Sequence, residues 1–178
     1  MNRLVTLMPL LGLSLAVVAS GWAAEANTEQ AKAVAEIERL GGKVMVDEKS
    51  QAVIGVSLRK TKVTDADLVH LDGLTSLKDL DLSHTKLTDV GLEHVKGLNN
   101  LQWLGLGGTA VTDAGLVHLK GLTKIQWVGL AETKVTDVGL EHLKKLTTLQ
   151  SLYLGDTHVT NDGVEKFKRA LPTCYVFR

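Results

Sequence analysis

The sequence has little of several features that point to particular protein classes. Its 178 residues include one cysteine, Cys174, and two prolines, and aromatic residues make up 4% of the chain. One cysteine excludes an internal disulfide, so packing has to supply the stability. We expect Cys174 to pack near the end of the fold; a free thiol and a bond to another chain are the alternatives. The formal net charge is zero, which argues against nucleic acid or an anionic membrane as partner.

Catalytic and cofactor motifs are missing as well. The sequence contains no HExxH, no Gly-x-Ser-x-Gly and no Cys/His pair. The segment Gly105–Thr109 (GLGGT) superficially resembles a phosphate loop, but it lacks the Lys-Ser/Thr ending and does not open a helix. We therefore predict that the protein is not an enzyme, and we expect no cofactor.

Residues 1–23 have the pattern of a secretory signal peptide. Arg3 precedes an apolar run from Leu4 to Val18, and small residues follow before Ala26. The run is about 15 residues long, which is short for a membrane span. We predict a cleaved signal and export to the periplasm or the medium. An uncleaved anchor is the alternative.

A 24-residue repeat dominates the rest of the chain. Shifting the sequence by this period aligns three apolar columns: Leu77, Leu101, Ile125 and Leu149; Leu80, Leu104, Val128 and Leu152; and Leu82, Leu106, Leu130 and Leu154. The unit is L-x-x-L-x-L-x-x-T-x-V-T-D-x-G-L-x-H-L-K-G-L-x-x. A fixed period of this length is typical of a solenoid, whose units bury their apolar faces only against one another.

Each unit has a strand half and a helix half. Leu80 and Leu82 alternate with variable residues, which predicts a short strand with one buried face. Leu92, Val95 and Leu98 recur at spacings of three, which predicts about two turns of helix. Good N-cap residues, Thr88-Asp89, precede this helix, and a C-cap glycine, Gly97, follows it.

The repeat resembles the leucine-rich repeat over residues 53–178. Its T-x-V-T-D-x-G-L variant is similar to repeats of secreted bacterial leucine-rich repeat proteins and is related in pattern to F-box leucine-rich repeats. The resemblance implies an α/β solenoid of five units and a terminal strand. It should form a right-handed horseshoe arc with a parallel sheet on the concave face and short helices on the convex face. At one position of the unit many leucine-rich repeats carry Asn, whereas this chain has threonine: Thr61, Thr85, Thr109, Thr133 and Thr157. We expect the threonine hydroxyls to satisfy backbone groups there.

Residues 24–52 do not follow the repeat. Asn27-Thr28 is expected to cap a helix from Glu29 to Leu40. Alternating residues then predict strands over Lys43–Val46 and Ala52–Leu58. We expect this segment to form an N-terminal cap that covers the first apolar face and whose antiparallel hairpin blunts the sheet edge.

The residues between the strand leucines should face the concave surface. They form three columns: Gly55, Asp79, Trp103, Trp127, Ser151 and Tyr175; Ser57, Asp81, Gly105, Gly129, Tyr153 and Phe177; and Arg59, Ser83, Gly107, Ala131 and Gly155. Of the seven aromatic residues, five fall in these columns: Trp103, Trp127, Tyr153, Tyr175 and Phe177. Because the tryptophans have glycine or alanine neighbours, we expect a flat, exposed aromatic binding surface. The alternative is that the rings stack on one another and stiffen the sheet.

A polar group lies beside these aromatic residues. Asp79 and Asp81 are two residues apart on one strand, so both should face the groove, with Arg59 and His84 nearby. We interpret the carboxylates as candidates for receiving a basic group of a ligand. A solvated patch is one alternative. A divalent cation held by the two aspartates and His84 is another, although we expect no metal.

Two further columns suggest packing rather than chemistry. One histidine per unit occurs at His70, His94, His118 and His142. Neighbouring helices are about 8–10 Å apart, so we expect these side chains to pack or hydrogen-bond between repeats rather than to share a metal. One glycine per unit occurs at Gly91, Gly115, Gly139 and Gly163, where a side chain should push the helix off the sheet.

The sequence therefore predicts an exported module that binds a protein or peptide through its concave face. A carbohydrate-binding protein of the cell envelope is one alternative, because aromatic surfaces also suit sugars. A structural module that self-associates through the C-terminal strand, Tyr175 to Arg178, is another.

Overall fold

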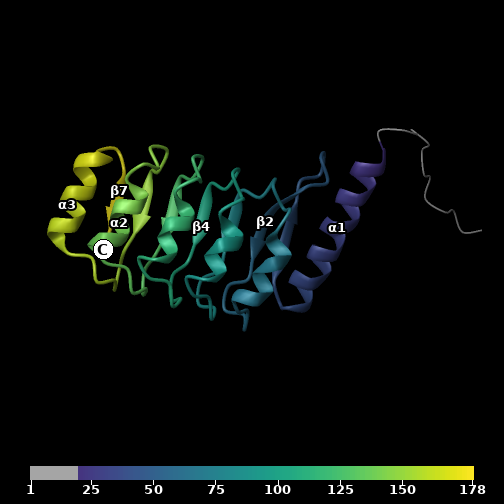
Figure 1. The fold of residues 1–178 in the computed structure, drawn as a ribbon, viewed down its shortest axis with the longest axis horizontal. Helices are drawn as coiled ribbons and strands as arrows, with labels where there is room; N and C mark the ends of the chain where they lie inside the picture. Colours follow the sequence, from purple (N-terminus) through teal and green to yellow (C-terminus); the bar gives the residue numbers. More distant parts are fainter. Residues whose placement is uncertain (1–19) are drawn as a thin grey trace, which may run out of the picture.

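The computed structural model describes residues 20–178, with side chains described from Thr28 onward. The helix α1 (Ser20–Arg39) leads into β1 (Lys43–Val46) and β2 (Val53–Ser57), after which helical segments and strands alternate along the array (Figure 1). The remaining strands are β3 (Asp79–Asp81), β4 (Trp103–Gly105), β5 (Trp127–Gly129), β6 (Ser151–Tyr153) and β7 (Tyr175–Phe177). The helical segments are the 3-10 helices η1 (Asp65–Leu71), η2 (Gly91–Val95) and η3 (Gly115–Leu119), and the α-helices α2 (Asp137–Leu143) and α3 (Asn161–Ala170).

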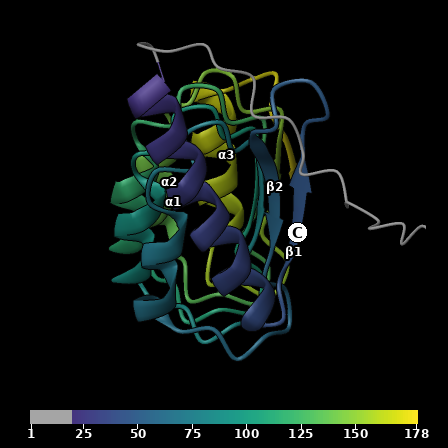
Figure 2. The ribbon, with the colours of Figure 1, turned by 90° about the vertical axis from the view of Figure 1, so that its right-hand side faces the viewer.

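The strands form one seven-stranded sheet in chain order from β1 to β7. β1 pairs with β2 antiparallel, which confirms the predicted hairpin, and the later pairs are parallel. Seen along the array, the helical segments lie on one side of the sheet and leave its other face uncovered (Figure 2). The predicted α/β solenoid is confirmed, and the face without helices is the concave face.

The helix α1 begins earlier than the sequence predicted. We expected a helix from Glu29 to Leu40, whereas α1 runs from Ser20 to Arg39. The cap expected at Asn27-Thr28 is wrong because the alanine-rich stretch before it favours continuous helix. Of the predicted signal peptide, residues 1–19 lie outside the described residues and residues 20–23 lie in α1. Ile37 of α1 is completely buried, so the helix closes the first end of the core.

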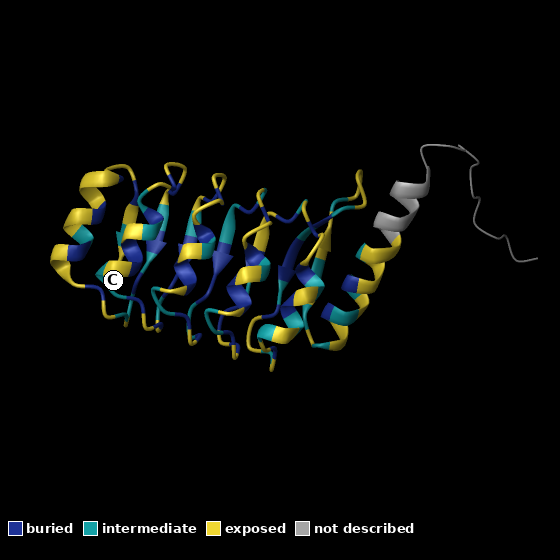
Figure 3. Cartoon of the chain, in the orientation of Figure 1, coloured by how far each residue is buried: buried dark blue, intermediate teal, exposed yellow. Residues whose placement is uncertain are grey.

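The predicted leucine columns form the core. Buried positions face the interior between the sheet and the helical segments, while exposed positions lie on the outer sides (Figure 3). The threonine column has the structural role that we expected. Each hydroxyl donates to the carbonyl oxygen three residues earlier, at 2.6–2.7 Å, in Thr61, Thr85, Thr109, Thr133 and Thr157.

Three of the five helical halves, η1, η2 and η3, are 3-10 helices. η2 and η3 are 3-10 helices of five residues, and only α2 and α3 are α-helices. An apolar spacing of three matches the three residues per turn of a 3-10 helix, which the pattern alone did not distinguish from an α-helix. Gly97 is not a left-handed C-cap either, because its φ is not positive. The turn there closes instead through the N–H of Leu98, which donates to the carbonyl of Val95 at 3.0 Å.

Aspartate and threonine side chains link each unit to the next, an arrangement that we name the Asp–Thr ladder. In each link one carboxylate oxygen accepts from the threonine N–H at 2.7–2.8 Å, and the other accepts from its hydroxyl at 2.6–2.7 Å. The links are Asp65 to Thr88, Asp89 to Thr112, Asp113 to Thr136, and Asp137 to Thr160. In the last link, the hydroxyl and N–H of Thr160 lower the pKa of Asp137.

The glycine column makes room for this ladder. A Cβ added at Gly115 would lie 2.4 Å from Oδ1 of Asp89, and one at Gly139 would lie 2.4 Å from Oδ1 of Asp113. The packing role that we expected for this column is therefore confirmed. At Gly115 and Gly139 the closest contact is with the aspartate of the preceding unit, which occupies the space that a side chain would need.

The first and last units depart from the ladder. In the first unit Asp67 stands in the glycine column, and its Oδ2 accepts from the N–H and the hydroxyl of Thr64, both at 2.8 Å. These two bonds, the N–H first, lower the pKa of Asp67. In the last unit Asn161 stands in the aspartate column, and its Oδ1 accepts from the guanidinium of Arg178. Both departures still satisfy local polar groups.

Cys174 lies in the core, which confirms the packing role predicted for it. Its side chain is 3% exposed, and burial raises the pKa of its thiol to about 11. Because the thiolate is the reactive form, we predict that a maleimide leaves the native protein unlabelled near neutral pH and labels the urea-unfolded chain completely. Mass spectrometry reads out both states. Rapid labelling of the native chain would contradict the buried placement.

Candidate functional site

Two rows of side chains follow the strand register across the concave face. The first row is Met45, Gly55, Asp79, Trp103, Trp127, Ser151 and Tyr175. The second row is Lys43, Ser57, Asp81, Gly105, Gly129, Tyr153 and Phe177. The first two predicted columns are therefore correct from β2 onward. Sequence reasoning missed Met45 and Lys43 because β1 is antiparallel and outside the repeat.

The third predicted column is only partly correct. Arg59 is exposed, but Ser83 is 5% exposed and so does not contribute to the surface. Its hydroxyl oxygen would lie 2.8 Å from a Cβ added at Gly105. The Ser83 hydroxyl therefore lies close to Gly105 of β4, in space that a side chain at that position would need.

Four aromatic rings form a continuous column that we name the aromatic stack. Trp103 and Trp127 have ring centroids 4.3 Å apart and planes within 8° of parallel. Trp127 and Tyr153 are 4.9 Å apart with a tilt of 40°, and Tyr153 stacks on Phe177 at 4.4 Å and 15°. The rings thus cover one another's faces along the array. Tyr175 is not in the stack and is 70% exposed.

Glycines explain how the stack crosses from one row to the other. A Cβ at Gly105 would lie 2.8 Å from Cη2 of Trp103, and a Cβ at Gly129 would lie 2.5 Å from Cη2 of Trp127. Each indole therefore leans over the glycine two residues later in its own strand. This brings the tryptophans of the first row into line with Tyr153 of the second row.

The flat, exposed aromatic surface that we expected is therefore wrong in its geometry. The glycine positions are filled by the indoles rather than open, and Trp103, Trp127 and Tyr153 are only partly exposed. The stacking that we considered as the alternative is present. A ligand above the concave face meets mainly ring edges, because the faces of the inner rings are covered by their neighbours.

A hollow of about 420 Å³ opens beside Trp103, towards β1. Gly55, Met45, Asp79, Asp81 and Trp103 contribute to its lining. Its space depends on Gly55, where an added Cβ would lie 3.1 Å from Cβ of Met45 and 3.8 Å from Cβ of Asp79. Trp103 borders the hollow and stacks on Trp127 on its other side, so it is the ring at which the aromatic stack meets the hollow.

The two aspartates of the hollow differ in their partners. Oδ1 of Asp81 accepts from the N–H of Ser83 at 3.0 Å, and Oδ2 lies 3.8 Å from Nη1 of Arg59. Asp79 is exposed and has no hydrogen-bond or ion-pair partner among the residues that the structure describes. The structure therefore brings together Asp79, Asp81 and Arg59 as predicted, and it leaves one carboxylate uncompensated.

His84 does not join this group. It has a left-handed backbone with φ of 56°, as have Lys60, Glu132 and Asp156 at the same place in other units. Gly108 occupies that place in its own unit with φ of 66°, and a Cβ there would lie 2.3 Å from Nδ1 of His84. The GLGGT segment is thus a repeat turn whose glycine makes room for the His84 ring.

The histidine column forms a contact between repeats at His94. Its Nδ1 lies 3.1 Å from both carboxylate oxygens of Asp72, a residue of the preceding unit. This confirms the predicted hydrogen bonding between repeats at that position. Within residues 20–178, no three His, Cys, Asp or Glu side chains are grouped so that they could hold a metal ion.

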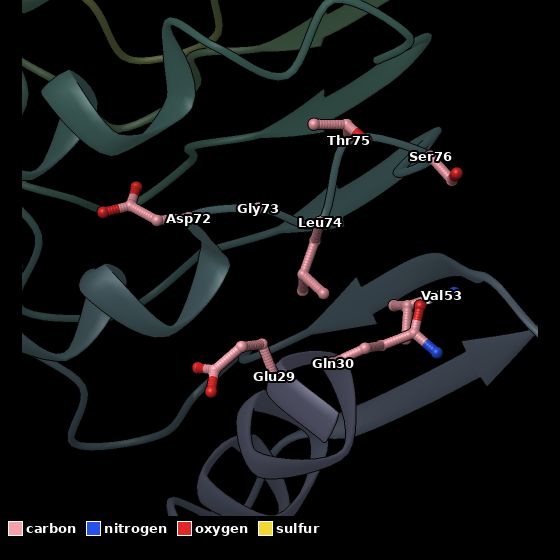
Figure 4. A pocket seen from close by; sticks show the side chains of 8 residues that line it. All are labelled: Glu29, Gln30, Val53, Asp72, Gly73, Leu74, Thr75 and Ser76. Atoms are coloured by element: carbon pink, nitrogen blue, oxygen red, sulfur yellow. Dashed lines mark hydrogen bonds between the residues drawn. The ribbon is translucent and has the colours of Figure 1, made fainter. Parts of the chain in front are cut away.

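A second hollow, of about 350 Å³, lies between α1 and the loop from Asp72 to Ser76 (Figure 4). Gln30 of α1 projects into it, accepting from the N–H of Val53 at 3.0 Å and donating to the carbonyl of Gln51 at 2.8 Å. These bonds tie α1 to the hairpin. The hollow contains no aromatic side chain, and we assign it to the junction between α1 and the first repeat.

Comparisons with known proteins agree with this architecture. Two models of the leucine-rich repeat match, over residues 56–111 and over residues 145–168. An internalin (inlF) from Listeria monocytogenes has a similar solved structure, with a TM-score of 0.54 and 23% identity. The chain is a leucine-rich repeat protein.

Other comparisons show how far the likeness of this leucine-rich repeat protein extends. The internalin match covers 62% of the chain and 31% of the internalin, so the chain spans about a third of that structure. The leucine-rich repeat ectodomain of the receptor kinase SOBIR1 from Arabidopsis thaliana is also similar, with a TM-score of 0.53 and 15% identity over 84% of this chain and 91% of that one. No curated protein sequence matches. At these identities the likeness shows the fold alone.

The family gives the general kind of function that such proteins have, and it does not identify a ligand. Leucine-rich repeat proteins are generally non-enzymatic scaffolds for protein–protein interaction. Among the residues that the structure describes, no helix combines the length and apolar character that crossing a bilayer requires.

Proposed function

We propose that this leucine-rich repeat protein is an exported module that recognises a protein or peptide through its concave face. The observation that carries the proposal is the aromatic stack, which lies on a sheet face left uncovered by the helices and ends at a hollow with a free carboxylate. Aromatic residues are enriched where proteins bind one another, and charged groups orient the partner. The apolar run after Arg3 supports export.

The geometry supports a protein or peptide more than a glycan. Sugar rings pack on aromatic faces, and the inner rings of the aromatic stack cover one another's faces. Ring edges and the neighbouring polar groups suit side chains and a peptide backbone. Self-association is the second candidate, because Tyr175 and Phe177 of β7 are 70% and 45% exposed.

The test introduces an arginine at one position on the concave face and, in a separate variant, at one position on the convex side. Ser151 lies between Trp127 and Tyr175 in the first concave row, whereas Val90 is 69% exposed at the start of the convex turn η2. We predict that Ser151→Arg weakens binding at least about tenfold, which is about 1.4 kcal/mol, and that Val90→Arg leaves it unchanged. Neither change removes a ring from the aromatic stack, so both variants should fold.

Binding is measured by capturing proteins from the cell envelope and medium of the source organism and then titrating the captured partner against each variant. Circular dichroism first verifies folding. Equal capture by wild type and Ser151→Arg, or capture by neither, contradicts the proposal. Light scattering of the same samples identifies self-association as a mass that rises with protein concentration.

A further inference from the structure

The aromatic stack has one ring that borders the hollow. Trp103 lines it, while Trp127 stacks on the opposite side of Trp103 at 4.3 Å. The indole of Trp103 therefore turns one face to Trp127 and the other to the hollow. An indole face carries negative electrostatic potential and attracts cations within about 6 Å of the ring centroid more strongly than the other aromatic side chains do.

The carboxylates add to this potential. Asp79 is the register neighbour of Trp103 on β3 and has no partner among the described residues. Asp81, the other carboxylate, has an ion-pair partner, because its Oδ2 lies 3.8 Å from Nη1 of Arg59. Lys43 also lines the hollow, in the second row on β1, where Ser57 on β2 separates it from Asp81. The hollow therefore has two charged groups without an ion-pair partner among the described residues, the ammonium of Lys43 at its β1 edge and the carboxylate of Asp79 beside Trp103.

The apolar part of the hollow suits an alkyl chain. Met45 faces Asp79 across Gly55, with its sulfur 3.8 Å from the Cβ that Gly55 lacks. A thioether is polarisable and adapts its packing to the groups that it contacts. The volume of about 420 Å³ is large enough for a single long side chain.

We propose that this hollow binds an arginine side chain of the partner peptide. The guanidinium lies on the face of Trp103 and pairs with Asp79, and the methylene stem packs on Met45. Arginine fits better than lysine because its planar group stacks on an aromatic ring and donates two parallel hydrogen bonds to one carboxylate. The proposal rests on the proposed function, since it names the chemistry that the concave face recognises.

The test uses a small probe so that the partner need not be known. N-acetyl-arginine amide is titrated against the full chain, and the indole N–H signal of Trp103 is followed by NMR after assignment with Trp103→Phe. A ligand of this size that gains about 0.3 kcal/mol per atom has a Kd of roughly 1 mM. We expect a saturable shift in that range. N-acetylcitrulline amide, which has the same shape without the charge, should bind at least about tenfold more weakly.

Matched variants assign the effect to Asp79. Asp79→Asn should weaken arginine binding at least about fivefold, because it removes the charge and keeps the shape. Asp156→Asn is the control: Asp156 is exposed in a distant turn with φ of 56°, a conformation that asparagine also adopts. Equal binding of citrulline amide, an unchanged Kd in Asp79→Asn, or no shift of the Trp103 signal overturns the proposal.

The two proposals fail separately. If arginine amide binds as expected while Ser151→Arg still captures the partner, the hollow is a cation site but the concave face is not the protein-binding surface. If Ser151→Arg loses the partner and Asp79→Asn binds both the partner and arginine amide like wild type, the concave face binds protein without an arginine in the hollow.

Discussion

Replacing Gly115 by alanine should destabilise the protein by about 3 kcal/mol. The new Cβ would lie 2.4 Å from Oδ1 of Asp89, 2.8 Å from Cδ1 of Leu92 and 3.1 Å from Cα of Asp89. The leucine can move its flexible end, but the carboxylate is held by the N–H and hydroxyl of Thr112 at 2.7 and 2.6 Å. Moving it breaks a link of the Asp–Thr ladder. Urea unfolding measures the loss, and the melting temperature should fall by roughly 10 °C.

The matched control is Gly121→Ala, the same change six residues later. A Cβ at Gly121 meets nothing within 4 Å, and its φ is not positive. Lys145 stands at the same place in the repeat, so a side chain is tolerated there. We expect the free energy of unfolding to stay within about 0.5 kcal/mol or to rise slightly, since alanine restricts the unfolded chain. Equal losses in both variants would mean that the space beside Asp89 is not what makes Gly115 necessary.

The core could be predicted from the sequence because its signal repeats. Every unit places leucine or a close relative at the same positions, and period two or three decides which residues are buried. The residues of the ladder were visible in the same way, since Thr recurs in every unit and Asp in every unit but the last. We interpreted Thr88 and Asp89 as caps of their own helix. Thr88 does accept from the N–H of Val90 at 3.3 Å, but a pattern within one unit does not show that Asp89 binds the next.

The concave site was predictable in composition but not in shape. Strand alternation correctly placed Asp79, Trp103 and Trp127 on one face. The direction of each ring depends on its side-chain rotamer, which is set by the space above Gly105 and Gly129. That space was interpreted as open, whereas the indoles fill it. The hollow depends on β1, which lies outside the repeat.

The stacking also changes how the aromatic residues should be tested. If the aromatic surface were flat and exposed, removing Trp103 and Trp127 together would leave the fold intact. Ring pairs of this geometry contribute about 0.5–1.5 kcal/mol each beyond their buried area, and Trp127 has a partner on both sides. Loss of binding in that double variant would therefore mix stability with recognition. Ser151→Arg and Asp79→Asn avoid this because they leave every ring in place.

Asp89→Ala should also cost about 3 kcal/mol, because it leaves the N–H and hydroxyl of Thr112 without their charged acceptor. Asp89→Asn should lose less. An amide oxygen still accepts from the N–H, its NH₂ group donates to the hydroxyl oxygen, and Asn161 occupies the same place in the last unit. Chemical unfolding of the three proteins measures the series, and an alanine variant as stable as the wild type would show that the ladder contributes nothing.

The two stability predictions are coupled, and their combination is the sharper test. If Gly115→Ala acts by displacing the Asp89 carboxylate, then it should cost only about 1 kcal/mol in the Asp89→Ala protein. The remainder comes from Leu92 and the Cα of Asp89, which still lie within 3.1 Å of the new Cβ. Two independent defects would instead add to about 6 kcal/mol. A double-mutant cycle of urea unfolding distinguishes these outcomes. Additivity would show that the glycine column and the Asp–Thr ladder are separate features, whereas coupling would show that each unit keeps its glycine to admit the aspartate of the unit before it.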